Sequence, residues 1–196
     1  MGYQMSEAGI MWNDELKLRL ILRVVADQLH LSDEAVAERL RQLALLMPTL
    51  QQKLPAMKPQ LIARLAADVP AVAAAMLQLK DVFPEADVAK LAVREPALVL
   101  GFDMVRLRGV AEELRQLLPR LNVDRLVEEN PSMLDVRQFA EAMQEAKRIM
   151  PSLDIQQAMA NDPQVILGFQ RGSQLIPYDE PGREKDDDEY GSYYSW

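Results

Sequence analysis

Residues 83–100 read FPEADVAKLAVREPALVL, and this stretch decides the fold of the chain. Its two prolines, Pro84 and Pro96, stand 12 positions apart. A proline inside a helix removes a hydrogen bond and clashes with the preceding turn, so each must mark the start or the end of a helix. Asp87 is a residue type that caps helix N-termini. The stretch therefore predicts a short helix between two proline turns.

The same pattern returns twice further along the chain. Residues 118–134 read LPRLNVDRLVEENPSML and residues 150–166 read MPSLDIQQAMANDPQVI, each with its prolines 12 positions apart. The first prolines of successive copies are separated by 35 and then 32 residues. Asn122 and Asp154 take the place of Asp87 as potential caps. The predicted short helices cover about 87–95, 122–129 and 154–161, and we call the segments 83–117, 118–149 and 150–169 the proline units.

Each unit is expected to continue in the same way after its second proline. A turn directs two apolar side chains into the core, and longer amphipathic helices, predicted at 103–117 and 135–149, connect one unit to the next. The paired apolar residues are Leu98 and Val99, Met133 and Leu134, and Val165 and Ile166.

The chain upstream of the proline units also reads as helical. Apolar residues recur at three- and four-residue steps after Asn13, which predicts a helix at 14–29. Ser32 followed by acids predicts the start of a second helix, and the two form a helical hairpin. Shorter helices are predicted at about 49–57, 59–68 and 71–82. No segment alternates apolar and polar residues long enough for a strand, so the predicted fold class is all-α.

A unit of this size cannot cover its own apolar stripe, so the units are expected to stack on one another as a short helical-repeat solenoid. A plain helical bundle whose prolines only punctuate loops is the alternative. An earlier unit beginning at Pro48 fits either Pro59 or Pro70 as its second proline. The predicted organisation is an N-terminal helical region at 1–82 that acts as a cap, proline-punctuated repeats at 83–169, and an extended acidic and aromatic tail at 170–196.

The tail differs in composition from the rest of the chain. Between Asp179 and Glu189 there are seven acids and two bases, which leaves 23 acids and 20 bases elsewhere. Such a segment is too polar to form a packed domain, so we expect it to be disordered in isolation. Aromatic side chains are frequent anchors at protein interfaces. We therefore predict that the tail binds a partner through Tyr178, Tyr190, Tyr193, Tyr194 and Trp196.

The pattern Phe83-Pro84-x-x-Asp87-Val88-x-x-Leu91, leading to Pro96-x-Leu98-Val99, resembles the repeat of the mitochondrial transcription termination factor (mTERF) family of plant and algal organelles. The resemblance covers about residues 83–169. It implies an all-helical solenoid in a chloroplast or mitochondrion, in a family that commonly grips nucleic acid through Lys and Arg on its inner groove.

The distribution of charge favours another kind of partner. The chain has 30 acids and 22 bases, and the segment 103–148 holds nine acids and eight bases. This spacing lacks the uninterrupted cationic track that phosphate contacts favour. We expect these arginines to lie on solvated faces and to pair at helical spacing with Glu112, Glu113, Glu128 or Glu145. Under the nucleic-acid alternative, the contacts come from Arg106, Arg108 and Arg115.

Several kinds of chemistry are excluded by composition. The chain has no cysteine and one histidine, His30, so disulfides, thiol nucleophiles, zinc ribbons and multi-histidine metal sites are excluded. The acids at 186–189 lack the alternating order of a calcium loop. No catalytic residue, cofactor or metal ligand is predicted, and the protein is not expected to be an enzyme. The longest segments without charge, 42–52 and 69–79, are shorter than the roughly 18 residues of a membrane span, so none is predicted.

These expectations favour a non-catalytic adaptor or auxiliary factor that docks on protein subunits of a larger organellar complex. The preferred role is assembly, repair or stabilisation of a photosynthetic complex in the chloroplast, in the stroma or at the thylakoid surface, and peripheral membrane association through partners is compatible with it. The mitochondrion is the alternative location. The alternative function is that of an mTERF-like nucleic-acid-binding protein in transcription termination or RNA processing.

Overall fold

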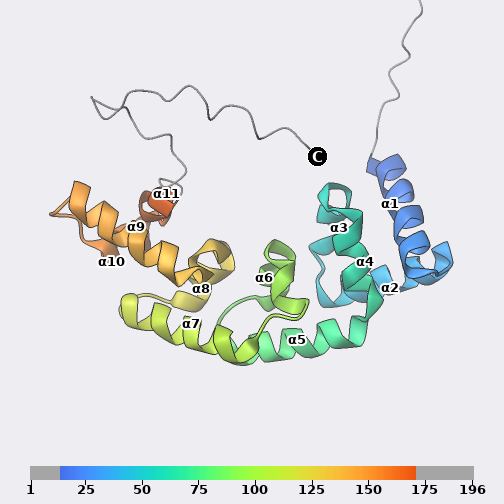
Figure 1. Cartoon of the computed structure of the whole chain (residues 1–196), viewed down its shortest axis with the longest axis horizontal. Helices are drawn as coiled ribbons and strands as arrows, with labels where there is room; N and C mark the ends of the chain where they lie inside the picture. The colour runs from blue at the N-terminus through green and yellow to red at the C-terminus, as the bar shows by residue number, and fades with distance from the viewer. Residues whose placement is uncertain (1–13, 171–196) are drawn as a thin grey trace, which may run out of the picture.

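The computed structural model describes residues 14–170, and all the secondary structure within this range is helical. This confirms the all-α prediction for that part of the chain. The helices follow one another along a curved arc, with α1 at one end and α11 at the other (Figure 1). Over this range they are α1 (Asp14–Leu29), α2 (Asp33–Leu46), α3 (Leu50–Lys53), α4 (Pro59–Ala67), α5 (Val69–Val82), α6 (Val88–Arg94), α7 (Met104–Leu117), α8 (Val123–Glu129), α9 (Val136–Ile149), α10 (Ile155–Asn161) and α11 (Gln164–Gln170).

The N-terminal helices form where the pattern predicted them. Helix α1 has the predicted bounds, and α2 begins after Ser32, whose hydroxyl accepts a hydrogen bond from the Ala35 amide at 3.2 Å. The chain reverses between them at His30, which has a left-handed φ of 53°. Helix α1 then packs against α2 and also against α4. The segment predicted at 49–57 is divided between α3 and a 3₁₀ turn, η1 (Leu54–Ala56).

The proline units have the predicted local structure. Asp87, Asn122 and Asp154 each cap a seven-residue helix by accepting hydrogen bonds from backbone amides of its first turn. The second proline of the first two units then begins a 3₁₀ turn, because its fixed φ and missing N–H suit the first position of a helix. These turns are η2 (Pro96–Val99) and η3 (Pro131–Leu134).

The longer helices α5, α7 and α9 have the same length, 14 residues. Each begins after an aspartate cap, namely Asp68, Asp103 and Asp135. In Figure 1, α5 and α7 lie along the outer edge of the arc, and α6 lies on its inner side. The buried apolar side chains form one continuous cluster from Val25 to Leu167.

The prediction for the last unit was wrong at Val165. Leu98, Val99 and Met133 are buried as expected, and Leu134 is half-buried, whereas Val165 is exposed and Ile166 is fully buried. The reason is that the turn after Pro163 is the α-helix α11. Neighbouring residues of an α-helix point about 100° apart, so only one of the pair faces the core.

The first and second units differ in length because of a three-residue link, Leu100-Gly101-Phe102. Turn η2 is joined to the cap Asp103 by this link, whereas η3 is followed directly by Asp135. Gly101 has a φ of 100°, a left-handed conformation that residues with a Cβ rarely adopt. The link accounts for the difference between the spacings of 35 and 32 residues.

Candidate protein-interaction surface

The first and second proline units are joined by two buried carboxylates, Asp124 and Glu128, both on α8. The Glu85 amide donates to Asp124 Oδ2 at 3.0 Å, and Arg115 Nη2 donates to Asp124 Oδ1 at 2.7 Å. Arg115 Nη2 also donates to the Val82 carbonyl at 2.8 Å, so it bridges Asp124 to the end of α5. Asp124 is therefore held by the backbone of the preceding unit and by a cation from α7.

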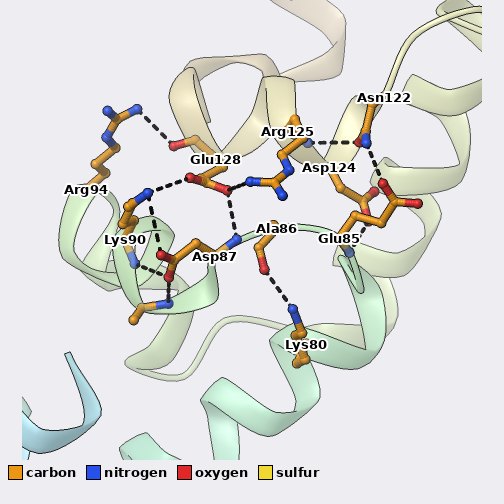
Figure 2. Close-up of polar contacts among 11 residues, drawn as sticks. Lys80, Glu85, Ala86, Asp87, Lys90, Arg94, Asn122, Asp124, Arg125 and Glu128 are labelled. Atoms are coloured by element: carbon orange, nitrogen blue, oxygen red, sulfur yellow. Dashed lines mark hydrogen bonds and ion pairs between the residues drawn. The ribbon is translucent and has the colours of Figure 1, made fainter. Parts of the chain in front are cut away.

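Glu128 joins the same two units on the side of α6 (Figure 2). We call each such contact between neighbouring units a joint. The Asp87 amide donates to Glu128 Oε2 at 2.7 Å, and Lys90 Nζ lies 3.5 Å from Oε1. Arg125 Nη1 lies 3.7 Å from Oε2. Among residues 16–169, whose side chains the structure describes, Asp124 and Glu128 are the buried charged residues, and no buried polar side-chain atom lacks a hydrogen-bond partner. Buried charges are tolerated only when they are paired in this way.

The second and third units are joined by two glutamines, Gln156 on α10 and Gln164 on α11. Gln164 Nε2 donates to Asn130 Oδ1 at 3.0 Å. Gln156 makes two hydrogen bonds to the backbone of the second unit and of the end of α7. Its Nε2 donates to the Leu117 carbonyl at 2.9 Å, and its Oε1 accepts a hydrogen bond from the Arg120 amide at 3.4 Å. This joint contains no buried charge. The two joints show that neighbouring units are held in fixed register by backbone-directed hydrogen bonds.

Two arginines, on α2 and α6, also donate to carbonyls at the ends of short helices further along the chain. Arg94 Nη1 donates to the Glu128 carbonyl at 3.0 Å and also to the Glu129 carbonyl at the end of α8. Arg39 Nη1 donates to the Ala66 and Ala67 carbonyls at 2.9 and 3.0 Å, at the end of α4. The last carbonyls of a helix have no partner within it, so each arginine supplies donors that the helix lacks.

These joint residues were missed by the sequence analysis, which expected Glu128 on a solvated face. The expected pairing with Arg125 does form, but the carboxylate is buried. A usable signal was present when the units are aligned with one another: Asp124 and Gln156 are polar at the position where the first unit has Ala89. Glu145 pairs with Arg148 as expected, at 2.7 Å on the surface, and this hydrogen bond holds the pKa of Glu145 below its ordinary value.

The three arginines of the nucleic-acid alternative do not have equivalent surroundings. Arg106 and Arg108 are exposed on α7, and their guanidinium groups pair with no other residue of the described range. Arg115 is engaged by Asp124 and by the Val82 carbonyl. The structure therefore leaves two of the three free to contact a ligand. The predicted tail anchors Tyr178, Tyr190, Tyr193, Tyr194 and Trp196 lie outside the described residues.

Large aliphatic side chains are exposed on each of the helices α5, α7 and α9. They are Leu77 on α5, Val105 on α7 and Ile149 on α9, with 70%, 84% and 52% of their surface accessible. Each helix buries its opposite face in the common core. We call these three residues the exposed aliphatic set.

A shallow groove with an apolar floor lies between α7, α9 and α10. Its floor is formed by half-buried Leu117, Ala140 and Met143 together with buried Ile155, and its volume is about 520 Å³. Gln144, Lys147 and Arg148 also line it. We call it the α9 groove. A more polar hollow of about 580 Å³, which includes Arg120, shares Lys147 and Ile155 with it.

No group of acidic or histidine side chains within residues 14–170 is arranged to hold a metal ion. In the same range, no single helix has both the length and the hydropathy to cross a membrane; α4 and α5 meet that test only together, and they are bent by 89° relative to each other. No protein-family model, curated protein or solved structure matches the chain.

Proposed function

We propose that this chain is a non-catalytic helical-repeat adaptor, an mTERF-like solenoid whose surface docks on protein subunits of a larger organellar complex. The preferred role is assembly, repair or stabilisation of a photosynthetic complex. Location in the chloroplast, with the mitochondrion as alternative, rests on the sequence resemblance of the proline units. The joints support the first part of the proposal, because buried Asp124 on α8 and half-buried Gln156 on α10 fix the register of neighbouring units.

The observation that carries the proposal is the exposed aliphatic set. Leu77, Val105 and Ile149 are on successive long helices, so the surface presented by these helices combines large apolar side chains with polar ones. Exposed apolar surface with a polar surround is typical of protein–protein interaction sites.

The proposal is tested by a pull-down from chloroplast extract with the tagged full chain. The variant Leu77→Glu/Val105→Glu places two charges in the exposed aliphatic set, and Gln78→Glu/Gln116→Glu is its control. The control adds the same two charges to exposed positions of the same two helices. We expect the first variant to lose most of the recovered protein subunits and the control to retain them. Equal recovery by both variants would contradict the proposed docking surface.

The tail is tested separately by removal of residues 178–196. The proposal expects the truncated chain to recover less of the partner than the full chain does, because the aromatic anchors are lost. Equal recovery of every partner by both forms would remove the tail from the proposal and leave the helical surface as the docking site.

Nucleic-acid binding is the second candidate, supported by the unpaired guanidinium groups of Arg106 and Arg108 on the exposed side of α7. It predicts binding to RNA or DNA that weakens with salt and with Arg106→Ala/Arg108→Ala. No gel shift with either nucleic acid at low salt would exclude it.

A further inference from the structure

The α9 groove combines an apolar floor with a cation that has no partner. Met143, Leu117 and Ala140 are half-buried around Ile155, and Lys147 is exposed at the edge without an ion pair to any described residue. The neighbouring hollow adds the guanidinium of Arg120, which is also unpaired within this range. This composition suits a ligand that carries both aromatic rings and negative charge.

The other charged groups around the groove are already engaged. Arg148 is paired with Glu145 by two hydrogen bonds at 2.7 and 2.8 Å. One acid, Asp154, borders the hollow, and its carboxylate accepts hydrogen bonds from the Gln156 and Gln157 amides at the start of α10. The charge around the groove and the hollow is therefore positive on balance, with Lys147 and Arg120 against the single carboxylate of Asp154.

We infer that the α9 groove is the docking site of this chain's own C-terminal segment. The acids of residues 179–189 lie beside Lys147 and Arg120, and the aromatic residues of 190–196 lie on the apolar floor. The net excess of five acids in 179–189 is opposite in sign to the two unpaired cations and exceeds them in number. The thioether of Met143 is suited to aromatic rings, because sulfur makes favourable contacts with them. The inference concerns the free protein and holds or fails independently of the proposed adaptor role.

The length of the segment permits this arrangement. It starts directly after α11, which packs against α9, the central helix of the groove. Helix α9 has 14 residues and so spans about 21 Å at 1.5 Å per residue. The 26 residues after Gln170 can extend over about 85 Å at about 3.3 Å per residue. Residues 179–196 can therefore reach any point along α9 without strain.

The first experiment is carbodiimide cross-linking of the purified full chain, followed by peptide mapping. The reagent activates a carboxylate, and attack by a lysine amine then forms an amide where the two groups are in contact. We expect the main product to join Lys147 to a carboxylate of residues 179–189 within one chain. Its yield should fall several-fold at 1 M salt, where charges are screened within about 3 Å. Equal yields at every lysine, or products only in cross-linked dimers, would overturn the inference.

The second experiment uses fluorescence and needs no cross-link. In a Trp12→Phe background, Trp196 is the remaining tryptophan. We expect blue-shifted emission from a ring on the apolar floor, and a red shift towards free tryptophan in Met143→Glu and in Lys147→Glu. Lys147→Arg keeps the charge, so it should retain the blue shift while losing the cross-link. The control Gln78→Glu should leave both signals unchanged. Fully solvated emission in the parent chain, or emission unchanged by Lys147→Glu, would overturn the inference.

Discussion

Asp124 and Gln156 occupy the same position in successive proline units, and each accepts a hydrogen bond from the same backbone amide of the unit before it. That amide belongs to the residue after the first proline, Glu85 for Asp124 and Arg120 for Gln156. The amide group of Gln156 also donates to the carbonyl two residues before that proline. The carboxylate of Asp124 cannot donate a hydrogen bond. The equivalent carbonyl, that of Val82, therefore accepts one from Arg115 instead. Gln156 therefore makes by itself the two hydrogen bonds that Asp124 and Arg115 make together in the preceding joint.

This equivalence predicts a coupling between Asp124 and Arg115. Arg115→Ala should lower the free energy of unfolding by about 2 kcal/mol, because it leaves Asp124 buried without its cation. In an Asp124→Gln background, the same substitution should cost less than about 1 kcal/mol, since the glutamine can donate to Val82 as Gln156 does to Leu117. A double-mutant cycle by urea denaturation measures the difference. An equal cost of Arg115→Ala in both backgrounds would show that the two joints are not interchangeable.

The arginines that cap short helices are expected to contribute more than surface ion pairs. Arg94→Ala and Arg39→Ala should each destabilise the protein by about 1–2 kcal/mol, since each leaves helix-end carbonyls without a donor. Arg137→Ala is the control, because Arg137 pairs with Glu141 on an open surface, and it should cost less than about 0.5 kcal/mol. Thermal unfolding checks all three. A cost for Arg94→Ala no greater than the control's would contradict the assignment.

Gly101 and Gly109 should respond in opposite directions to replacement by alanine. A methyl group added at either glycine would meet no atom within 4 Å, so the change in stability depends only on the backbone conformation. Gly101→Ala should destabilise by about 1–2 kcal/mol, because the φ of 100° is strained for alanine. Gly109→Ala, inside α7, should stabilise by about 0.5–1 kcal/mol. Denaturant midpoints of the two variants test the prediction, and a shift of both in the same direction would refute it.

The last unit offers a comparison between two adjacent residues. Ile166 is fully buried, whereas 39% of the Val165 surface is accessible, so Ile166→Ala should cost about 2–4 kcal/mol and Val165→Ala less than about 1 kcal/mol. Hydrogen exchange of α11 amides reports the loss even if the rest of the protein stays folded. Similar effects of the two substitutions would mean that α11 does not pack as described.

The surface pair of Glu145 and Arg148 makes a prediction about titration. The Arg148 guanidinium donates to Glu145 and lowers the pKa of that carboxyl, so Arg148→Ala should raise the Glu145 pKa towards its ordinary value. Carboxyl-carbon NMR titration measures the change. Glu34 is an internal reference, because its pKa is lowered by backbone and Ser32 hydrogen bonds that the substitution does not touch. A Glu145 pKa that stays the same in the variant would contradict the pairing.

The sequence predicted the helices well because their ends depend on local chemistry. Prolines and caps such as Asp87 act within one turn, so the bounds of the short and long helices could be read from the pattern. Burial in the last unit could not, because the choice between a 3₁₀ turn and an α-helix after Pro163 depends on packing. The conformation of Gly101 was also missed, since an isolated glycine gives no sign of its φ.

The candidate surface was harder to predict than the fold. Glu128 is on a helix at a spacing that suits a solvated pair with Arg125, and its burial arises only when α6 packs across it. The α9 groove likewise combines residues from three helices, Leu117, Met143 and Ile155 among them. Of these contacts between distant segments, only those of Asp124 and Gln156 have a signal in the sequence, the polar residue at the same position of successive units.

The joints have a mechanical consequence. Asp124, Gln156 and Arg94 each bind the adjacent unit, so a load applied to the two ends of the arc is carried by these hydrogen bonds together with the shared apolar core. Small angular adjustments at successive joints add up along the molecule, as they do in stacked helical proteins generally. Because all the units share one apolar core, a change of angle at any joint also requires the buried side chains of both neighbouring units to repack.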